Sequence, residues 1–173
     1  DSLLEELKVH LEFLGYDVDA KDDTLFISQP GRFSWLLRDF NGGAGTDTVS
    51  YASSSVPITV SLAIAGQQNI GGVMATLVSI ENLIGSQHAD TFTGNGGSNL
   101  LSGGDGNDVL NGGTGTDTAV FSGNRFDYLV TPEGEGYRLK DQRSGANDGN
   151  GLATGIAVFE FATGTVLAAD LLI

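Results

Sequence analysis

The sequence predicts an all-β fold in which short parallel strands stack into a coil, that is, a β-solenoid. The strongest evidence is a nine-residue unit, Gly-Gly-x-Gly-x-Asp-x-U-x with U a large apolar residue, which recurs at a fixed period. Glycine supplies 26 of the 173 residues, a proportion that suits a chain of tight turns. Acidic residues also gather where basic residues are missing, which predicts that a bound metal ion supplies positive charge.

Composition argues against several classes of function. The chain has 22 acidic against 8 basic residues and a formal net charge of -14, so a nucleic-acid partner is not expected. No Lys or Arg lies between Arg38 and Arg125. The absence of Cys removes disulfides and thiolate chemistry and is compatible with secretion. No apolar run approaches the roughly 18 residues of a membrane span and no basic-then-apolar leader opens the sequence, so we expect no membrane span.

The first 41 residues predict a small unit of one helix and short strands. Leucines share one helical face over 2–14, with Ser2 as a cap and Gly15 as a stop, and 16–28 suggests two short strands. We expect this unit to cover the open end of the coil. A remnant of a larger domain, or a partner-binding helix, is the alternative.

The nine-residue units begin at residue 42. Complete copies stand at 42–50, 103–111 and 112–120, the last with small Ala119 in the apolar place. Weaker copies stand at 85–93 and 94–102, so that four units run without a gap from 85 to 120.

The segment between the first unit and this run is less regular. Residues 51–70 alternate enough to predict longer strands. A decayed unit can be written at 71–79, with Thr76 in the acidic place. Farther on, Ile80 and Leu83 are expected to point inward while Glu81 faces water.

The residue types of one unit explain the coil. Six residues rich in glycine form a turn, and the last three suffice for a short strand with one inward side chain. Two units return the chain over itself after 18 residues, and the coils stack. The inward side chains of the run are Phe92, Leu101, Leu110 and Ala119.

Alternate units share an edge of the coil, so their sixth residues form two rows. Asp90 lies in one row with Asp108, and Asn99 in the other with Asp117. Carboxylates on strands about 4.8 Å apart repel one another unless a cation lies between them. Ca²⁺ takes six to eight oxygen ligands, which aspartates and turn carbonyls supply, whereas Mg²⁺ prefers a tighter octahedron. Metal-free turns held by Asp hydrogen bonds are the alternative.

These units resemble the nonapeptide repeats of the RTX family, calcium-binding β-rolls near the C-termini of bacterial proteins that are exported by type I secretion. The resemblance is specific over 85–120, clear at 42–50, and looser over 121–173, where FSGNRFDYLV, KDQRSGANDG and VFEFATGTV are similar to the closing segment of such proteins. It implies a parallel β-roll at 42–120, a small α/β cap or linker at 1–41, and a β-rich C-terminal cap at 121–173.

The resemblance also implies the calcium ligands. They are the side chains of Asp47, Asp90, Asn99, Asp108 and Asp117, together with the turn residues Gly43, Gly45, Gly103, Gly104, Asp105, Gly106, Gly112, Gly113, Thr114 and Gly115. Asn99 offers a neutral oxygen and His88 replaces a turn glycine, so sites built on those two units are expected to be weak or absent. The row of Asp90 and Asp108 is therefore expected to bind calcium more tightly than the row of Asn99 and Asp117.

The function that the resemblance implies is a secreted module that binds several Ca²⁺ ions outside the cell, folds on binding them, and supports type I secretion and folding of a larger protein such as a protease, lipase, toxin or adhesin. Its partners would be calcium ions and the type I secretion machinery. The terminal ADLLI resembles the end of several type I substrates, although a final strand of the cap predicts the same apolarity.

Two other classes of function are weighed against this one. A calcium-dependent polysaccharide-binding or adhesion module would need an exposed row of side chains, for which the candidates are Tyr51, Phe121, Tyr128 and Tyr137. A hydrolase has little support, because His10 and His88 do not form a metal-binding pair and Asp22-Asp23 reads as a solvated turn. We therefore expect no catalytic residues in this chain, and any active site of the larger protein to lie outside it.

Overall fold

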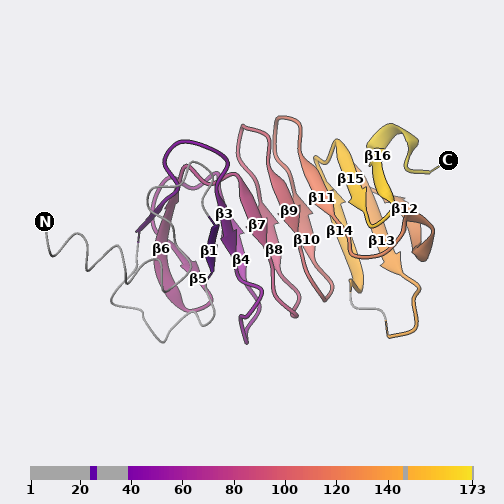
Figure 1. Cartoon of the computed structure of the whole chain (residues 1–173), viewed down its shortest axis with the longest axis horizontal. Helices are drawn as coiled ribbons and strands as arrows, with labels where there is room; N and C mark the ends of the chain where they lie inside the picture. Colours follow the sequence, from indigo (N-terminus) through magenta and orange to yellow (C-terminus); the bar gives the residue numbers. More distant parts are fainter. Residues whose placement is uncertain (1–23, 27–38, 146–147, 173) are drawn as a thin grey trace, which may run out of the picture.

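The structure, a computed structural model, describes residues 24–26, 39–145 and 148–172. The helix predicted over 2–14 lies outside the described residues, and of the strands predicted in 16–28 only Thr24–Phe26 is described. Two sheets made largely of parallel strands run the length of the molecule (Figure 1). The all-β parallel roll is therefore confirmed.

The first sheet has seven strands. In spatial order they are β1 (Thr24–Phe26), β3 (Thr48–Ser50), β7 (Asn82–Ile84), β9 (Leu100–Ser102), β11 (Thr118–Val120), β15 (Val158–Phe161) and β16 (Gly164–Leu167). All neighbours in it pair in parallel except β15 and β16, which are antiparallel.

The second sheet has six strands, and a third sheet has three. The second contains β12 (Tyr128–Glu133), β13 (Gly136–Asp141), β14 (Asn150–Thr154), β10 (Val109–Asn111), β8 (Thr91–Thr93) and β4 (Thr59–Ser61) in that order. The third contains β2 (Asp39–Asn41), β6 (Val73–Val78) and β5 (Gln68–Ile70). Two short 3₁₀ helices, η1 (Arg125–Asp127) and η2 (Ala168–Asp170), complete the described elements.

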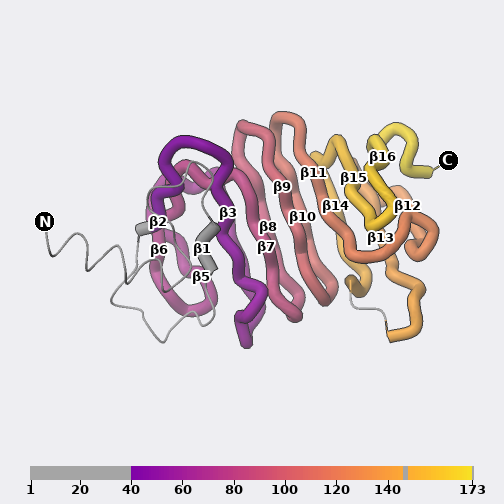
Figure 2. The backbone as a smooth tube through the Cα atoms, viewed as in Figure 1, coloured from indigo at the N-terminus to yellow at the C-terminus, as the bar shows by residue number. Residues whose placement is uncertain are grey.

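The pairing has the predicted period. Phe92 of β8 lies opposite Leu110 of β10, and Leu101 of β9 lies opposite Ala119 of β11, so each coil takes 18 residues. Figure 2 shows the part of the roll from β7 to β11 stacked in chain order along the long axis. Two units per coil are therefore confirmed.

The core is the narrow space between the two sheets. The inward residues of the repeat run, Phe92, Leu101, Leu110 and Ala119, are all buried. In the first sheet, Leu101 and Ala119 lie in line with Val49, Leu83 and Phe159. In the second sheet, Phe92 and Leu110 lie in line with Val60 and Ala153. Since each unit contributes one such side chain, no unit can bury its own apolar surface, and stacking is what excludes water.

The irregular segment departs from the prediction. Thr76 lies in β6 opposite Asp39 of the third sheet, so 71–79 is not a unit of the two-sheet roll. Asn82 instead lies opposite Thr48, which aligns Glu81 with Asp47. Ile80 and Leu83 point inward as expected, but Glu81 does not simply face water, because its Oε2 accepts the Asp47 N–H at 2.8 Å. The register follows inward Leu83 rather than the glycine pattern.

The C-terminal segment continues both sheets before it closes them. β14 pairs in parallel with β10, and β15 with β11, after which β12, β13 and β16 add antiparallel strands. Phe121, Tyr128, Phe159 and Phe161 pack together here, with ring centroids 5.5 to 6.2 Å apart. Strand pairing thus crosses residue 120, and the division of the chain at 41 and 120 stays a prediction.

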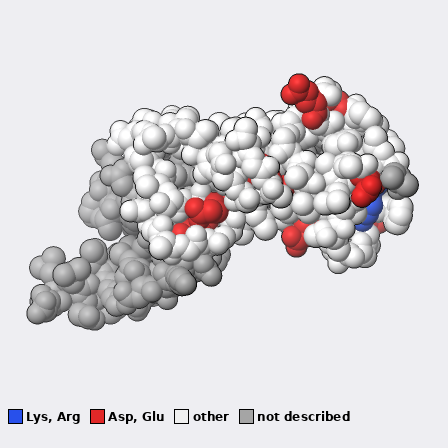
Figure 3. All heavy atoms as spheres, turned by 90° about the horizontal axis from the view of Figure 1, so that it is seen from above, with Lys and Arg blue, Asp and Glu red and all other residues white. Residues whose placement is uncertain are grey.

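Charge is distributed unevenly over the described surface. On the face shown in Figure 3 the basic side chains lie at the C-terminal end, while acidic side chains also lie farther along the roll. No described helix has the length and apolar character that a membrane crossing requires.

Candidate metal centre

The glycine-rich turns stack in two rows along the edges of the roll, seen as the loops above and below the strands in Figure 1. One row contains the turns 85–90 and 103–108, which precede β8 and β10. The other contains 42–47, 94–99 and 112–117, which precede β3, β9 and β11. Asp90 therefore shares a row with Asp108, and Asn99 with Asp117, as the period predicted.

Three turns share one backbone conformation, with positive φ at the second and fourth residues. The angles are 86° and 134° at Gly43 and Gly45, 86° and 123° at Gly104 and Gly106, and 90° and 124° at Gly113 and Gly115. Side chains rarely adopt this region, so glycine is required there.

The same glycines leave room for backbone oxygens of the preceding turn. A methyl group on Gly104 would lie 2.1 Å from the Ser86 carbonyl oxygen, and one on Gly106 would lie 2.7 Å from that of His88. In the other row, methyl groups on Gly113 and Gly115 would lie 2.6 and 2.4 Å from the carbonyl oxygens of Asn95 and Gly97. Carbonyl oxygens therefore line the interface between successive turns in both rows.

The side chain of Asp117 is deeply buried beside the turn of Asn99. The residue is 0 % exposed, and its Oδ1 accepts the Asn99 N–H at 2.8 Å. Its Oδ2 is buried and has no hydrogen-bond partner among the described residues. Burial raises the pKa of this carboxyl above its ordinary value, because the charged form loses its hydration.

Asp108 occupies the matching position in the other row. Its Oδ1 accepts the Asp90 N–H at 2.9 Å, and no described residue donates a hydrogen bond to its Oδ2. Desolvation raises the pKa of Asp108 to about 7, and the negative charges of Asp90, Asp148 and Asp105 act in the same direction. A carboxylate that is costly to ionise in this way would gain from a nearby cation.

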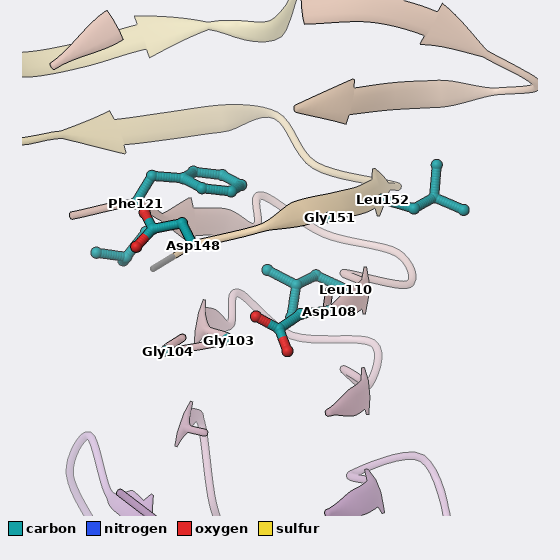
Figure 4. A pocket seen from close by; sticks show the side chains of 9 residues that line it. Gly103, Gly104, Asp108, Leu110, Phe121, Asp148, Gly151 and Leu152 are labelled. Atoms are coloured by element: carbon teal, nitrogen blue, oxygen red, sulfur yellow. The ribbon is translucent and has the colours of Figure 1, made fainter. Parts of the chain in front are cut away.

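A small cavity adjoins Asp108 at the C-terminal end of its row. Gly103, Gly104 and Asp108 contribute to its wall, together with Asp148 and the apolar side chains Leu110 and Phe121 (Figure 4). Asp148 is itself well satisfied, because it accepts hydrogen bonds from Ser122 N, Ser122 Oγ and Tyr128 Oη.

Asp90 and Asn99 have different surroundings. Asp90 accepts hydrogen bonds from Ile58 N at 2.7 Å, Ser86 N at 2.5 Å and the Ser86 hydroxyl. Asn99 accepts the Asn95 N–H at 2.8 Å and donates through Nδ2 to the Glu81 carbonyl at 2.9 Å. Both side chains are buried, and each bonds both to its own turn and to a residue of another part of the chain.

The remaining predicted ligands lie in the same turns. Asp47 is buried, and its N–H is held by Glu81. Asp105 N and Thr114 N donate to the carbonyl oxygens of Ser86 and Asn95 at 3.0 and 3.3 Å. Gly103 and Gly112 begin the two turns, where a methyl group would overlap Asp108 Oδ2 and the Gly155 carbonyl oxygen.

Two acidic residues of these rows were missed by the glycine pattern. Glu81 stands two residues before inward Leu83, just as Asp108 stands two residues before inward Leu110. This shared offset was the signal in the sequence. Asp148 reaches the end of the Asp108 row because β14 pairs with β10, for which the repeat offers no signal.

The donor set fits a hard cation. It consists of carboxylate, carbonyl and amide oxygens, the ligands that Ca²⁺ takes in flexible geometry. Within the part of the chain that the structure describes, no three His, Cys, Asp or Glu side chains come together to hold a metal. Backbone carbonyls would therefore complete the shell, as the glycine turns allow.

The comparisons with known proteins agree with this chemistry. The model of the RTX calcium-binding nonapeptide repeat matches residues 84–119 in four copies. No curated protein was found to match the chain. RTX nonapeptide repeats bind several Ca²⁺ ions and form a structural rather than a catalytic module. Residues 84–119 are therefore an RTX calcium-binding repeat region, which makes this part of the chain a Ca²⁺-binding module.

Proposed function

We propose that the chain folds when it binds extracellular Ca²⁺, and that it supports type I secretion and folding of a larger secreted protein. The observation that carries the proposal is the fully buried carboxylate of Asp117, whose Oδ2 has no hydrogen-bond partner in the described part of the chain. An ionised group in this position is costly unless a cation accompanies it.

The balance of forces without calcium favours an unfolded chain. Carboxylates that stack along the rows repel one another, and no Lys or Arg lies between Arg38 and Arg125 to neutralise them. Ordering 26 glycines costs more backbone entropy than ordering other residues. Calcium binding then supplies free energy to folding, because the turn carbonyls meet the carboxylates only in the stacked coil.

The proposed role in secretion rests on the same dependence of folding on calcium. Extracellular calcium modules have dissociation constants of about 10⁻⁴ to 10⁻³ M, so such sites fill outside the cell. A chain that stays unfolded until then is suited to a narrow export channel. We propose type I secretion machinery as a partner, and a protease, lipase, toxin or adhesin as the larger protein, with its activity outside this chain.

The C-terminal residues are compatible with an export signal. Ala168–Asp170 form a 3₁₀ turn rather than a final strand, Leu171 is fully buried, and Leu172 is half-exposed. Arg125 donates to the Leu171 carbonyl, so this terminus is attached to the cap in the folded state.

Circular dichroism of the purified chain tests calcium-dependent folding. We expect a disordered spectrum in EDTA, a β-rich spectrum after CaCl₂ is added, and loss of that spectrum when EDTA is returned. MgCl₂ at the same concentration is the control, because Mg²⁺ keeps its waters and demands an octahedron. A β-rich spectrum that chelator leaves unchanged would sink the proposal.

Polysaccharide binding has less support from the side chains. Tyr51, Phe121 and Tyr128 are buried in the core, and Tyr137 is half-buried with its hydroxyl donating to the Ala168 carbonyl. The four aromatic candidates therefore form no exposed row of the kind that a sugar ring stacks upon.

A further inference from the structure

We propose that, of the four matched turns, only 103–108 and 112–117 hold calcium through their sixth residues, Asp108 and Asp117. The turns 85–90 and 94–99 are closed by their own hydrogen bonds and hold no ion through Asp90 or Asn99. This inference rests on the proposed calcium binding and adds which copies perform it.

Both carboxylate oxygens of Asp90 already accept hydrogen bonds from buried donors. Oδ1 accepts from Ile58 N at 2.7 Å and Oδ2 from Ser86 N at 2.5 Å, while the Ser86 hydroxyl lies 3.2 and 3.0 Å from the two oxygens. The group is 1 % exposed. A calcium ion that used these oxygens would have to displace hydrogen bonds to buried donors, and each donor left unpaired costs about 1–3 kcal/mol.

The carboxamide of Asn99 is satisfied at both ends. Its Oδ1 accepts the Asn95 N–H at 2.8 Å, and its Nδ2 donates to the Glu81 carbonyl at 2.9 Å. The donated bond joins two successive coils of the row, where a carboxylate would face a carbonyl oxygen. Asn99 thus links two coils through a hydrogen bond, where a calcium ion would link them in an open turn.

From the described residues, Asp108 and Asp117 accept one hydrogen bond each. The donors are Asp90 N at 2.9 Å and Asn99 N at 2.8 Å, and both bonds are made to Oδ1. Oδ2 of Asp117 is buried without a partner in the described chain, and Oδ2 of Asp108 belongs to a side chain that lines the small cavity of Figure 4. These two carboxylates therefore keep lone pairs for a cation.

The second residue of the turn decides between the two states. Ser86 and Asn95 have no positive φ and direct their N–H groups onto the sixth side chain. Gly113 has a φ of 90° and donates instead to Asn111 Oδ1 at 3.1 Å. A glycine pair at the start of the unit thus marks an open turn, and this signal separates the copies that the family pattern groups together.

The ranking of the rows changes as a result. Stacking alone favoured the row in which Asp108 faces Asp90, because it contains two carboxylates. The hydrogen bonds remove Asp90 from that count, so each row retains one open carboxylate within the matched segment.

Ion counting on single variants tests the assignment. Asp90→Asn, Asp108→Asn and Asp117→Asn of the full chain are compared by native mass spectrometry and calcium titration calorimetry. We expect Asp108→Asn and Asp117→Asn to lose one bound ion each. Asp90→Asn is expected to keep the wild-type ion count and to unfold at a lower urea concentration, because an amide offers one acceptor oxygen instead of two.

Crystals of the wild-type chain grown with calcium give a readout that needs no variant to fold. We expect anomalous calcium peaks with Asp108 and Asp117 as ligands. A peak within ligand distance of Asp90 or Asn99 side-chain oxygens, or loss of an ion in Asp90→Asn, would overturn the assignment while leaving calcium-dependent folding intact. A wild-type chain that binds no calcium would overturn the proposed function together with it.

Discussion

At the scale of single residues, two aspartates of the roll have buried carboxylates that are costly to ionise. Asp108 and Asp117 are buried, and no Lys or Arg lies in the sequence between Arg38 and Arg125. Burial raises the pKa of both carboxyls, to about 7 for Asp108. Either protonation or a bound metal ion can therefore offset the cost of burying these negative charges, and the two are expected to compete.

At low pH, protonation of Asp108 is expected to stabilise the folded chain in part when calcium is absent. The pKa of Asp108 is about 7 in the folded chain against an ordinary value of 3.8, so between these values the folded chain binds more protons than the unfolded one. The stability from neutral Asp108 is present below about pH 4 and is lost as pH rises through about 7. In EDTA, we expect circular dichroism to show more β-structure at pH 5 than at pH 8.

The matched control is Asp108→Asn, which fixes the side chain in a neutral form. It should show a smaller change between pH 5 and pH 8 in EDTA. An unchanged pH dependence in this variant would assign the effect to other groups.

Asn95 and Asn99 allow a gain of function to be tested. Asn99→Asp alone keeps the closing N–H of Asn95 and loses the Nδ2 bond to Glu81, so we expect no additional ion. Asn95→Gly together with Asn99→Asp restores the glycine pair and the carboxylate, and should add one ion by native mass spectrometry. An additional ion in the single variant would show that the second residue does not control the turn.

At the scale of the turn, glycine serves two separable purposes. Gly43 and Gly104 both have a φ of 86°, but a methyl group on Gly43 would meet nothing within 4 Å, whereas one on Gly104 would lie 2.1 Å from the Ser86 carbonyl oxygen. The pair therefore separates backbone strain from crowding between coils.

Alanine substitution at these two glycines should have unequal effects. Gly43→Ala is expected to lower the free energy of unfolding by about 1–2 kcal/mol through left-handed strain alone. Gly104→Ala adds overpacking of about 1–3 kcal/mol, because the opposing carbonyl is backbone and cannot rotate away. Urea unfolding in saturating calcium measures both, and equal losses would mean that the coils can separate at no cost.

At the scale of the whole molecule, the repeat region and the C-terminal segment differ in the positive charge available to their acidic side chains. Arg143 lies 2.5 Å from Asp141 and 3.5 Å from Asp148, and its guanidinium lies 5.7 Å from the Tyr128 ring centre. Its hydrogen bond lowers the pKa of Asp141. The C-terminal segment thus contains its own positive charge, whereas the sequence of the repeat run at 85–120 contains no Lys or Arg.

Removing this arginine should destabilise the C-terminal segment without changing the ion count. Arg143→Gln removes the guanidinium that pairs with the buried carboxylate of Asp141, and we expect a loss of about 1–3 kcal/mol in urea unfolding with calcium present. Lys140→Gln removes the same charge from an exposed side chain and should cost little. Equal effects of the two variants would mean that only net charge matters.

The sequence by itself determined the repeating part of this protein. A period of nine with one inward side chain per unit placed Phe92, Leu101, Leu110 and Ala119 in the core, and the alternation of units placed Asp90 with Asp108 and Asn99 with Asp117. These features are local and periodic, so the residues of one unit are enough to specify them.

Only the tertiary structure decided how the periodic part begins, ends and distributes its open carboxylates. Glu81 came to lie beside Asp47, and Asp148 at the end of the Asp108 row, through strand pairings between residues far apart in the chain. The closure of Asp90 needs Ile58 from 32 residues earlier as well as Ser86. Such contacts depend on which strands become neighbours, and a repeating pattern does not encode that where the repeat breaks down.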